Sequence, residues 1–159
     1  ALGVQGLTPL ADGLLKALDT ARLEAFRKPG AKSIVVMLSD CYPEPITHRC
    51  ADLLDEPAYQ EAIRAAALYR KDAVSLLIIN PSFPAVRGNK PLKPGPRLAL
   101  RLVAASGGKL LKLPVTRQLS DGKPVVTSMD QSVNRILRLI DASFSGRPAG
   151  KDMDSFVVG

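Results

Sequence analysis

Hydrophobic positions in the first part of the chain follow two different periods. A helical period begins near Leu10 and ends at "RKPG" (27–30), and it is carried by Leu10, Leu14, Ala17, Leu18, Ala21 and Ala25. The next stretch, "SIVVMLSD" at 33–40, is continuously apolar and rich in β-branched residues, which is typical of a strand covered on both faces. We therefore expect a helix followed by a strand of a parallel sheet.

The alternation of helix and strand patterns continues through the middle of the chain. A second amphipathic helix is expected to begin near Pro57, with an inner face formed by Tyr59, Ala62, Ile63 and Ala66. The run "AVSLLIINPS" at 73–82 repeats the pattern of a buried strand. After a basic loop, "PRLALRLVAASGG" at 96–108 indicates a helix closed by glycine, and "KLLKLP" at 109–114 indicates a short strand.

A last helix is expected over residues 130–144, where the helical period is carried by Val133, Ile136, Leu137, Ile140 and Phe144. The tail at 146–159 is expected to be flexible, although its "SFVV" could add a short strand. This order of elements favours an α/β fold, with an open, mainly parallel sheet and helices on both faces. In such Rossmann-like folds, ligand sites gather at the carboxyl ends of the strands.

Length and composition fit one soluble domain. The chain has 159 residues, and 46% of them are hydrophobic, enough to bury a substantial core. No apolar run approaches the roughly 20 residues that span a bilayer, and no signal peptide begins the chain, so we expect a cytoplasmic protein without membrane contact. Cys41 and Cys50 flank His48, but a zinc site needs about four ligands, and both thiols are expected to be reduced and structural.

The net charge of +7 permits a second interpretation, a basic binding module. The stretch "VRGNKPLKPGPRLALR" at 86–101 concentrates five of the cations, which could attract nucleic acid or an acidic protein. Aromatic residues for base stacking make up 4% of the chain, and no nucleic-acid-binding motif is present. Nucleic acid is therefore the less favoured of the two partners.

A Rossmann-like enzyme is a third interpretation. Its phosphate loop would have to be "ASGGK" at 105–109, but this segment follows a helix and precedes a strand, the reverse of the required order. His48 is the only histidine, and no serine or cysteine stands in a nucleophile motif with it. A surface or structural role is favoured for this histidine.

Two polar residues mark the edge where a site is expected. In "GLTPLADGLL" (6–15), the hydroxyl of Thr8 can cap the first helix, and Pro9 suits the first helical position. Asp40 closes the first strand. Because helices that follow parallel strands begin at their carboxyl ends, Thr8 and Asp40 could both lie at that edge of the sheet.

Three segments resemble one family. "GLTPLADGLLKAL", "IVVMLSD" and "AASGGKLLKLP" are similar, in order and spacing, to segments of von Willebrand factor A (integrin I-like) domains. The resemblance covers most of residues 5–140 and is strongest to the D subunit of magnesium chelatase and the related cobalt chelatases.

The resemblance implies a metal-ion-dependent adhesion site (MIDAS). In the family, Mg²⁺ is held by an Asp-x-Ser-x-Ser loop and by the residues that match Thr8 and Asp40, and Mn²⁺ is an alternative ion. Ser39 would add a hydroxyl that supports these ligands without binding the ion itself. The ion would bridge to a carboxylate of a protein partner, so the domain itself would be non-catalytic. The parent subunit would assist an AAA+ ATPase in metal insertion into a tetrapyrrole.

The chain also departs from the family pattern. No Asp-x-Ser-x-Ser strand precedes the first helix, so residues 1–145 are interpreted as the carboxyl-terminal part of such a domain, which favours a homo-oligomer or a complementing chain. Cys41 stands where the family has glycine. "DASFS" fits the metal loop literally at Asp141, Ser143 and Ser145, as a circular permutation would require, but helical spacing favours a helix there.

Overall fold

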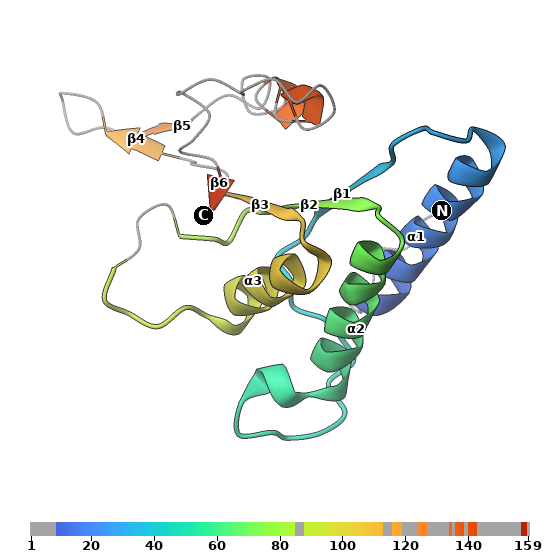
Figure 1. Cartoon of the computed structure of the whole chain (residues 1–159). Helices are drawn as coiled ribbons and strands as arrows, with labels where there is room; N and C mark the ends of the chain where they lie inside the picture. The colour runs from blue at the N-terminus through green and yellow to red at the C-terminus, as the bar shows by residue number, and fades with distance from the viewer. Residues whose placement is uncertain are drawn as a thin grey trace, which may run out of the picture.

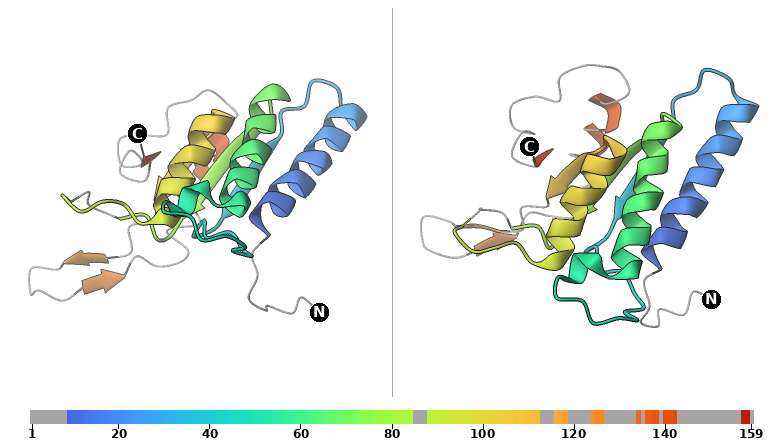
Figure 2. Two further views of the ribbon diagram at one scale, coloured as in Figure 1. Left: turned by 90° about the horizontal axis from the view of Figure 1, so that it is seen from below. Right: turned by 60° about the horizontal axis from the view of Figure 1, so that its bottom comes forward.

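The computed structural model describes residues 9–84, 88–112, 116–118, 124–126, 134, 136–138, 140–142 and 157–158. Helices and strands alternate, and Figures 1 and 2 show three helices side by side on one face of a sheet. The elements in chain order are α1 (Leu10–Arg27), β1 (Ile34–Leu38), η1 (Leu53–Asp55), α2 (Pro57–Lys71), β2 (Ser75–Asn80), α3 (Pro94–Ser106), β3 (Lys109–Lys112), β4 (Thr116–Gln118), β5 (Pro124–Val126) and β6 (Val157–Val158).

The main sheet has the strand order β1-β2-β3-β6. β1 pairs in parallel with β2, with Ile34 opposite Ser75, and β2 pairs in parallel with β3. β6 pairs with β3 in the antiparallel direction, so "SFVV" does contribute a short strand. β4 and β5 form a separate two-stranded sheet. The expected open, mainly parallel α/β sheet is confirmed at this level.

Local sequence explains where the helices begin and end. Prolines stand in the first turns of α2 and α3, where a missing amide hydrogen costs nothing. Gly107 ends α3 with a left-handed φ of 71°, a conformation that favours glycine, and its amide bonds to the carbonyl of Val103. No helix in the described part of the chain combines the length and the hydropathy needed to cross a membrane.

The main core lies between the three helices and the sheet. From the sheet, Leu76, Ile78 and Leu110 point into it and are almost fully buried. Tyr69 of α2 is buried as well, and its hydroxyl donates a 2.6 Å hydrogen bond to the carbonyl of Leu14 in α1. Helical side chains complete this core, among them Leu10, Leu14, Leu18, Tyr59, Ala62, Ala66, Leu98 and Leu102.

The opposite face of the sheet carries a smaller cluster. Leu77, Ile79 and Leu111 are buried there, and Ile136 and Ile140 pack against them. Residues 134, 136–138 and 140–142 are helical, which confirms the expected helix over these positions. Leu137 was assigned to the apolar face of that helix, but its side chain is 57% exposed, because only the Ile136–Ile140 side faces the sheet.

The expectation of a strand covered on both faces is wrong for β1. Its Val35 and Met37 pack on the main core, whereas Val36 is 43% and Leu38 68% exposed on the other face. The reason is position in the sheet: β1 is the edge strand, and the helical segment that contains Ile136 and Ile140 covers β2 and β3. β2, in the interior of the sheet, is buried on both faces as expected.

Candidate functional site

The candidate site lies at the edge where the parallel strands end and the three helices begin. We call this edge the rim, and it comprises Pro9, residues 39–45, residues 80–82 and residues 93–96. Each helix runs antiparallel to the strand that follows it, so the three helix starts meet the carboxyl ends of β1 and β2 (Figure 1). Parallel α/β sheets use this edge for ligands.

Asp40 projects from the rim at the end of β1. Its side chain is exposed, and its Oδ1 accepts a 3.3 Å hydrogen bond from the backbone N–H of Tyr42. Within the described part of the chain, Oδ2 has no hydrogen-bond partner. Ser39 holds the turn, because its hydroxyl oxygen accepts from the N–H of Cys41 at 3.0 Å and its own N–H donates to Ile79 at 3.1 Å. The turn therefore presents a carboxylate oxygen to solvent.

Cys41 forms this turn in a backbone conformation that favours glycine. Its φ is 60°, and an L-residue with a side chain pays roughly 1–2 kcal/mol in that region. The side chain is fully buried, and burial is the main cause that raises the pKa of its thiol to about 12. The cysteine thus makes the left-handed turn that glycine would make, while Asp40 stays exposed.

The start of α3 packs closely on the same turn. A Cβ on Gly95 would collide with the carbonyl oxygen of Asp40 and with the ring of Tyr42. Gly95 and Pro96 are buried in this contact. Only glycine therefore permits the observed approach of α3 to the turn after β1, which ties the loop that carries Asp40 to a rigid element.

Asn80 is a rim residue that the sequence pattern does not single out. It closes β2 and is fully buried, and its Oδ1 accepts a 2.9 Å hydrogen bond from the N–H of Ser82. Its Nδ2 has no partner in the described part of the chain. The available signal is a polar residue at the end of a buried apolar run, the same signal that points to Asp40 after β1.

Thr8 lies outside the described residues. Pro9, the next residue, flanks α1 rather than opening it, since the helix begins at Leu10. Pro9 and Leu10 line a groove of about 330 Å³ together with Leu38 and Ser39. The start of α1 and the end of β1 therefore meet at the rim.

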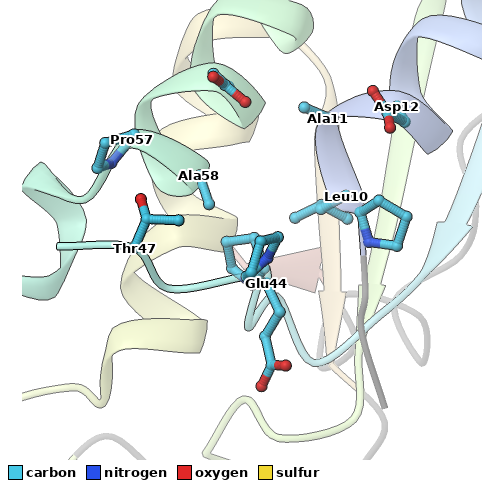
Figure 3. Close-up of a pocket in the computed structure, with 11 residues that line it drawn as sticks. Leu10, Ala11, Asp12, Glu44, Thr47, Pro57 and Ala58 are labelled. Atoms are coloured by element: carbon cyan, nitrogen blue, oxygen red, sulfur yellow. The ribbon is translucent and has the colours of Figure 1, made fainter. Parts of the chain in front are cut away.

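An acidic pocket of about 260 Å³ lies between the starts of α1 and α2 (Figure 3). Asp12, Glu44 and Glu61 line it, together with several prolines and Thr47. In Figure 3 the carboxylates of Asp12 and Glu44 lie on opposite sides of the pocket. Within the described residues, no three His, Cys, Asp or Glu side chains form a group that could hold a metal ion.

A basic pocket of about 970 Å³ is lined by residues from the turn after Asp40 and from the loop before α3. Tyr42 forms one wall, and residues 88–93 of the loop before α3 form another. Among the described residues that line it, Lys90 and Lys93 contribute the charges, and none is Asp or Glu. The turn that follows Asp40 thus contributes Tyr42 to the basic pocket, and Pro43, Glu44 and Pro45 to the acidic pocket.

His48, Cys50 and the glycines of "ASGGK" make contacts that belong to the fold. His48 donates its backbone N–H to Oε1 of the buried Glu56 at 2.5 Å, and its ring is 2.9 Å from the hydroxyl of Thr47. Cys50 is half-buried and, like Cys41, a free thiol. In "ASGGK", Gly107 ends α3, and a Cβ on the next glycine would collide with the carbonyl of Leu76. These glycines serve the contact between α3 and β2.

Comparisons with protein-family models, with curated proteins and with solved structures found no significant match for this chain. Its function is therefore inferred from the residues of the rim.

Proposed function

We propose that this chain is a non-catalytic protein-interaction domain of the von Willebrand A type that holds a divalent metal ion at Asp40. The observation that carries the proposal is the Asp40 carboxylate, which is exposed at the end of a parallel strand and has one oxygen without a partner among the described residues. Its place at the rim agrees with the place of ligand sites in open α/β sheets.

The available donors suit a hard cation. Asp40 supplies a carboxylate oxygen, and Thr8 supplies a hydroxyl from a residue bonded directly to Pro9, which lines the same groove as Ser39. Mg²⁺ prefers such oxygen ligands and keeps several waters where a protein supplies few of them, and Mn²⁺ accepts the same donors. The bound ion would supply an open coordination position for a carboxylate of the partner. Ser39 positions Asp40 through its hydrogen bond to Cys41.

A non-catalytic role agrees with the side chains at the rim. The thiol of Cys41 is buried, and its pKa of about 12 keeps it protonated at neutral pH, so it is a poor nucleophile. His48 is bonded to the adjacent Thr47 and belongs to the loop before η1, away from the turn of Asp40. From the resemblance, the parent is proposed to be a chelatase D-like subunit that works with an AAA+ ATPase in metal insertion into a tetrapyrrole.

The free edge of β1 supports a complementing chain as a second feature of the interaction domain. β1 contains no charge and no proline, which are two of the usual protections of an edge strand, and Val36 and Leu38 are exposed. α1 lies beyond this edge in Figures 1 and 2. A second copy paired to β1 in the antiparallel direction would bring its own α1 to the same place. A single strand from a partner is therefore favoured over a symmetric dimer.

The metal part of the proposal is tested by titration calorimetry with Mg²⁺ and Mn²⁺. We expect saturable binding to the wild-type chain and loss of binding in both Asp40→Ala and Thr8→Ala. Asp141→Ala, which removes an exposed carboxylate from the helical residues 140–142, is the matched control and should bind as the wild type does. Absence of binding to the wild type would refute the metal site, and loss in Asp141→Ala would favour a permuted one.

The edge is tested separately by sedimentation velocity. Val36→Lys places a charge in the middle of the exposed apolar edge, and it should reduce any association of the chain with itself or with an added partner. Leu23→Lys, at an exposed apolar position of α1, is the control for a general gain in solubility. A wild-type chain that stays monomeric and a partner that binds Val36→Lys as tightly as the wild type would contradict this part.

A further inference from the structure

The basic pocket is the largest of the cavities described at the rim and adjoins the proposed metal site. It has a volume of about 970 Å³, within the size range of ligand sites in proteins. Its lining residues come from the turn after β1, the turn after β2, the loop before α3 and the start of α3, and they include Tyr42, Ser82, Lys90, Leu92 and Lys93.

The walls of the basic pocket are held by residues with little conformational freedom. Pro84, Pro91 and Pro96 each have a fixed φ. Tyr42 is held by the close contact of its ring with Gly95 at the start of α3. The prolines reduce the backbone entropy that this lining loses when it binds a ligand, which favours affinity.

The charge of the basic pocket selects an acidic ligand. Lys90 and Lys93 are exposed, and neither forms an ion pair with another described residue. Carboxylates can therefore approach both ammonium groups without breaking an existing contact. Asn89 and Ser82 add neutral hydrogen-bond donors to the lining.

The apolar part of the lining selects a peptide over a nucleic acid. Leu92, the prolines and the ring of Tyr42 offer an apolar surface that an aliphatic side chain can cover. Single-stranded nucleic acids use several aromatic platforms and a long track of cations, whereas the described lining of this pocket has one aromatic ring and two lysines. Acidic and apolar side chains together describe a segment of protein.

We propose that the basic pocket binds a short acidic peptide segment of the partner, with carboxylates at Lys90 and Lys93 and an apolar side chain against Leu92 and Tyr42. This inference rests on the proposed function in one respect, that the same partner supplies the carboxylate for the metal ion. The two sites adjoin, because the N–H of Tyr42 donates to Asp40. One extended segment can therefore reach both.

Fluorescence anisotropy with a labelled peptide Asp-Glu-Leu-Asp-Glu-Leu tests the pocket on the full chain in EDTA. We expect saturable binding that weakens with salt, and a loss of about tenfold or more in the double variant Lys90→Glu/Lys93→Glu. Lys16→Glu/Lys28→Glu makes the same charge change at exposed positions of α1 and its carboxyl end, and it should bind within about twofold of the wild type. Circular dichroism checks that both variants fold.

Four results would contradict the proposal that the basic pocket binds an acidic peptide. They are no saturable binding of the peptide, equal loss in the control variant, equal binding of the uncharged peptide Asn-Gln-Leu-Asn-Gln-Leu, and tighter binding of an oligothymidylate than of the acidic peptide. Because the titration is made in EDTA, it is independent of the metal ion. Retained peptide binding in Asp40→Ala, together with no Mg²⁺ binding by calorimetry, would refute the metal site and leave the pocket in place.

Discussion

Two neighbouring strands, β1 and β2, are alike in sequence and differ in surroundings. Both are short apolar runs in parallel register. β2 lies between two strands and is buried over Leu76–Asn80, whereas β1 is the edge strand and leaves Val36 and Leu38 exposed. An apolar run thus predicts a strand, but the coverage of its faces depends on the elements that the rest of the chain places beside it.

The polar residues at the ends of these two strands also differ in burial. Asn80 after β2 is fully buried, and Asp40 after β1 is exposed. The first fixes the turn at residues 80–82 through its bond to Ser82, and the second presents a free carboxylate oxygen at the rim. At the rim, the end of the edge strand β1 is therefore suited to binding, and the end of the interior strand β2 supports the turn that follows it.

The largest effect is expected from truncating the buried strand. Ile78→Ala in β2 removes a fully buried side chain and should lower the free energy of unfolding by about 2–5 kcal/mol. Val36→Ala in β1 removes a partly exposed one and should cost less than about 1 kcal/mol. Urea titration followed by circular dichroism measures both. Equal losses would mean that β1 is as well covered in solution as β2.

The next largest difference in stability is expected between substitutions of Asn80 and Asp40, the polar residues at the ends of β2 and β1. Asn80→Ala leaves the Ser82 N–H without its partner and opens a small space in a buried site, so a loss of about 1–3 kcal/mol is expected. Asp40→Ala should stay within about 0.5 kcal/mol of the wild type, because the side chain is exposed. The same urea titrations apply. A large loss in Asp40→Ala would assign it a structural role and weaken its assignment as a ligand.

Alkaline pH should lower the free energy of unfolding, because three buried side chains would have to lose their protons. Burial raises the pKa of Cys41 from 9.0 to about 12, and it raises the pKa of Tyr59 and Tyr69 from 10.0 to about 12. All three groups lose protons more readily in the unfolded chain, so their contribution to stability is constant below pH 9 and falls between pH 9 and 12. Thermal midpoints measured across this range should decrease, and Cys41→Ala should show a weaker decrease.

Thiol labelling at neutral pH compares the buried Cys41 with the half-buried Cys50. With Ellman's reagent, Cys50 in its half-buried position should react in the folded protein, and Cys41 should react only after unfolding. Rapid labelling of Cys41 in the native state would mean that the turn after β1 opens freely, and the rim would then be less rigid than its contacts with Gly95 indicate.

The smallest effect is expected at the exposed pair between η1 and α3. Arg97 donates two hydrogen bonds to Asp52, at 3.1 and 2.6 Å, and this contact is the main cause that lowers the pKa of Asp52. Its contribution is present above pH 3.8 and is lost as the pH falls through the lower pKa of the folded state. Arg97→Gln should therefore narrow the difference in thermal midpoint between pH 5 and pH 3 slightly, because solvent screens the pair.

Much of the fold follows from local patterns. The period of Leu10, Leu14 and Leu18 predicts α1, and the runs at 33–40 and 73–82 predict β1 and β2, because amphipathic spacing and β-branched content reflect short-range preferences. The candidate site is less accessible to such reasoning. Asp40 is recognisable as the polar end of a strand, while the burial of Asn80 and the close approach of Gly95 arise from contacts between distant segments.

The sequence by itself determined the order of helices and strands, the glycine that ends α3 and the polar residue Asp40 that closes β1. These features depend on backbone preferences and on the spacing of apolar side chains within one segment. Only the tertiary structure decided that β1 lies at an edge, that Cys41 is buried with a raised pKa, and that the turn after Asp40 lines both an acidic and a basic pocket. Burial and electrostatic environment are set by neighbours that are remote in the chain, and those neighbours are chosen by packing.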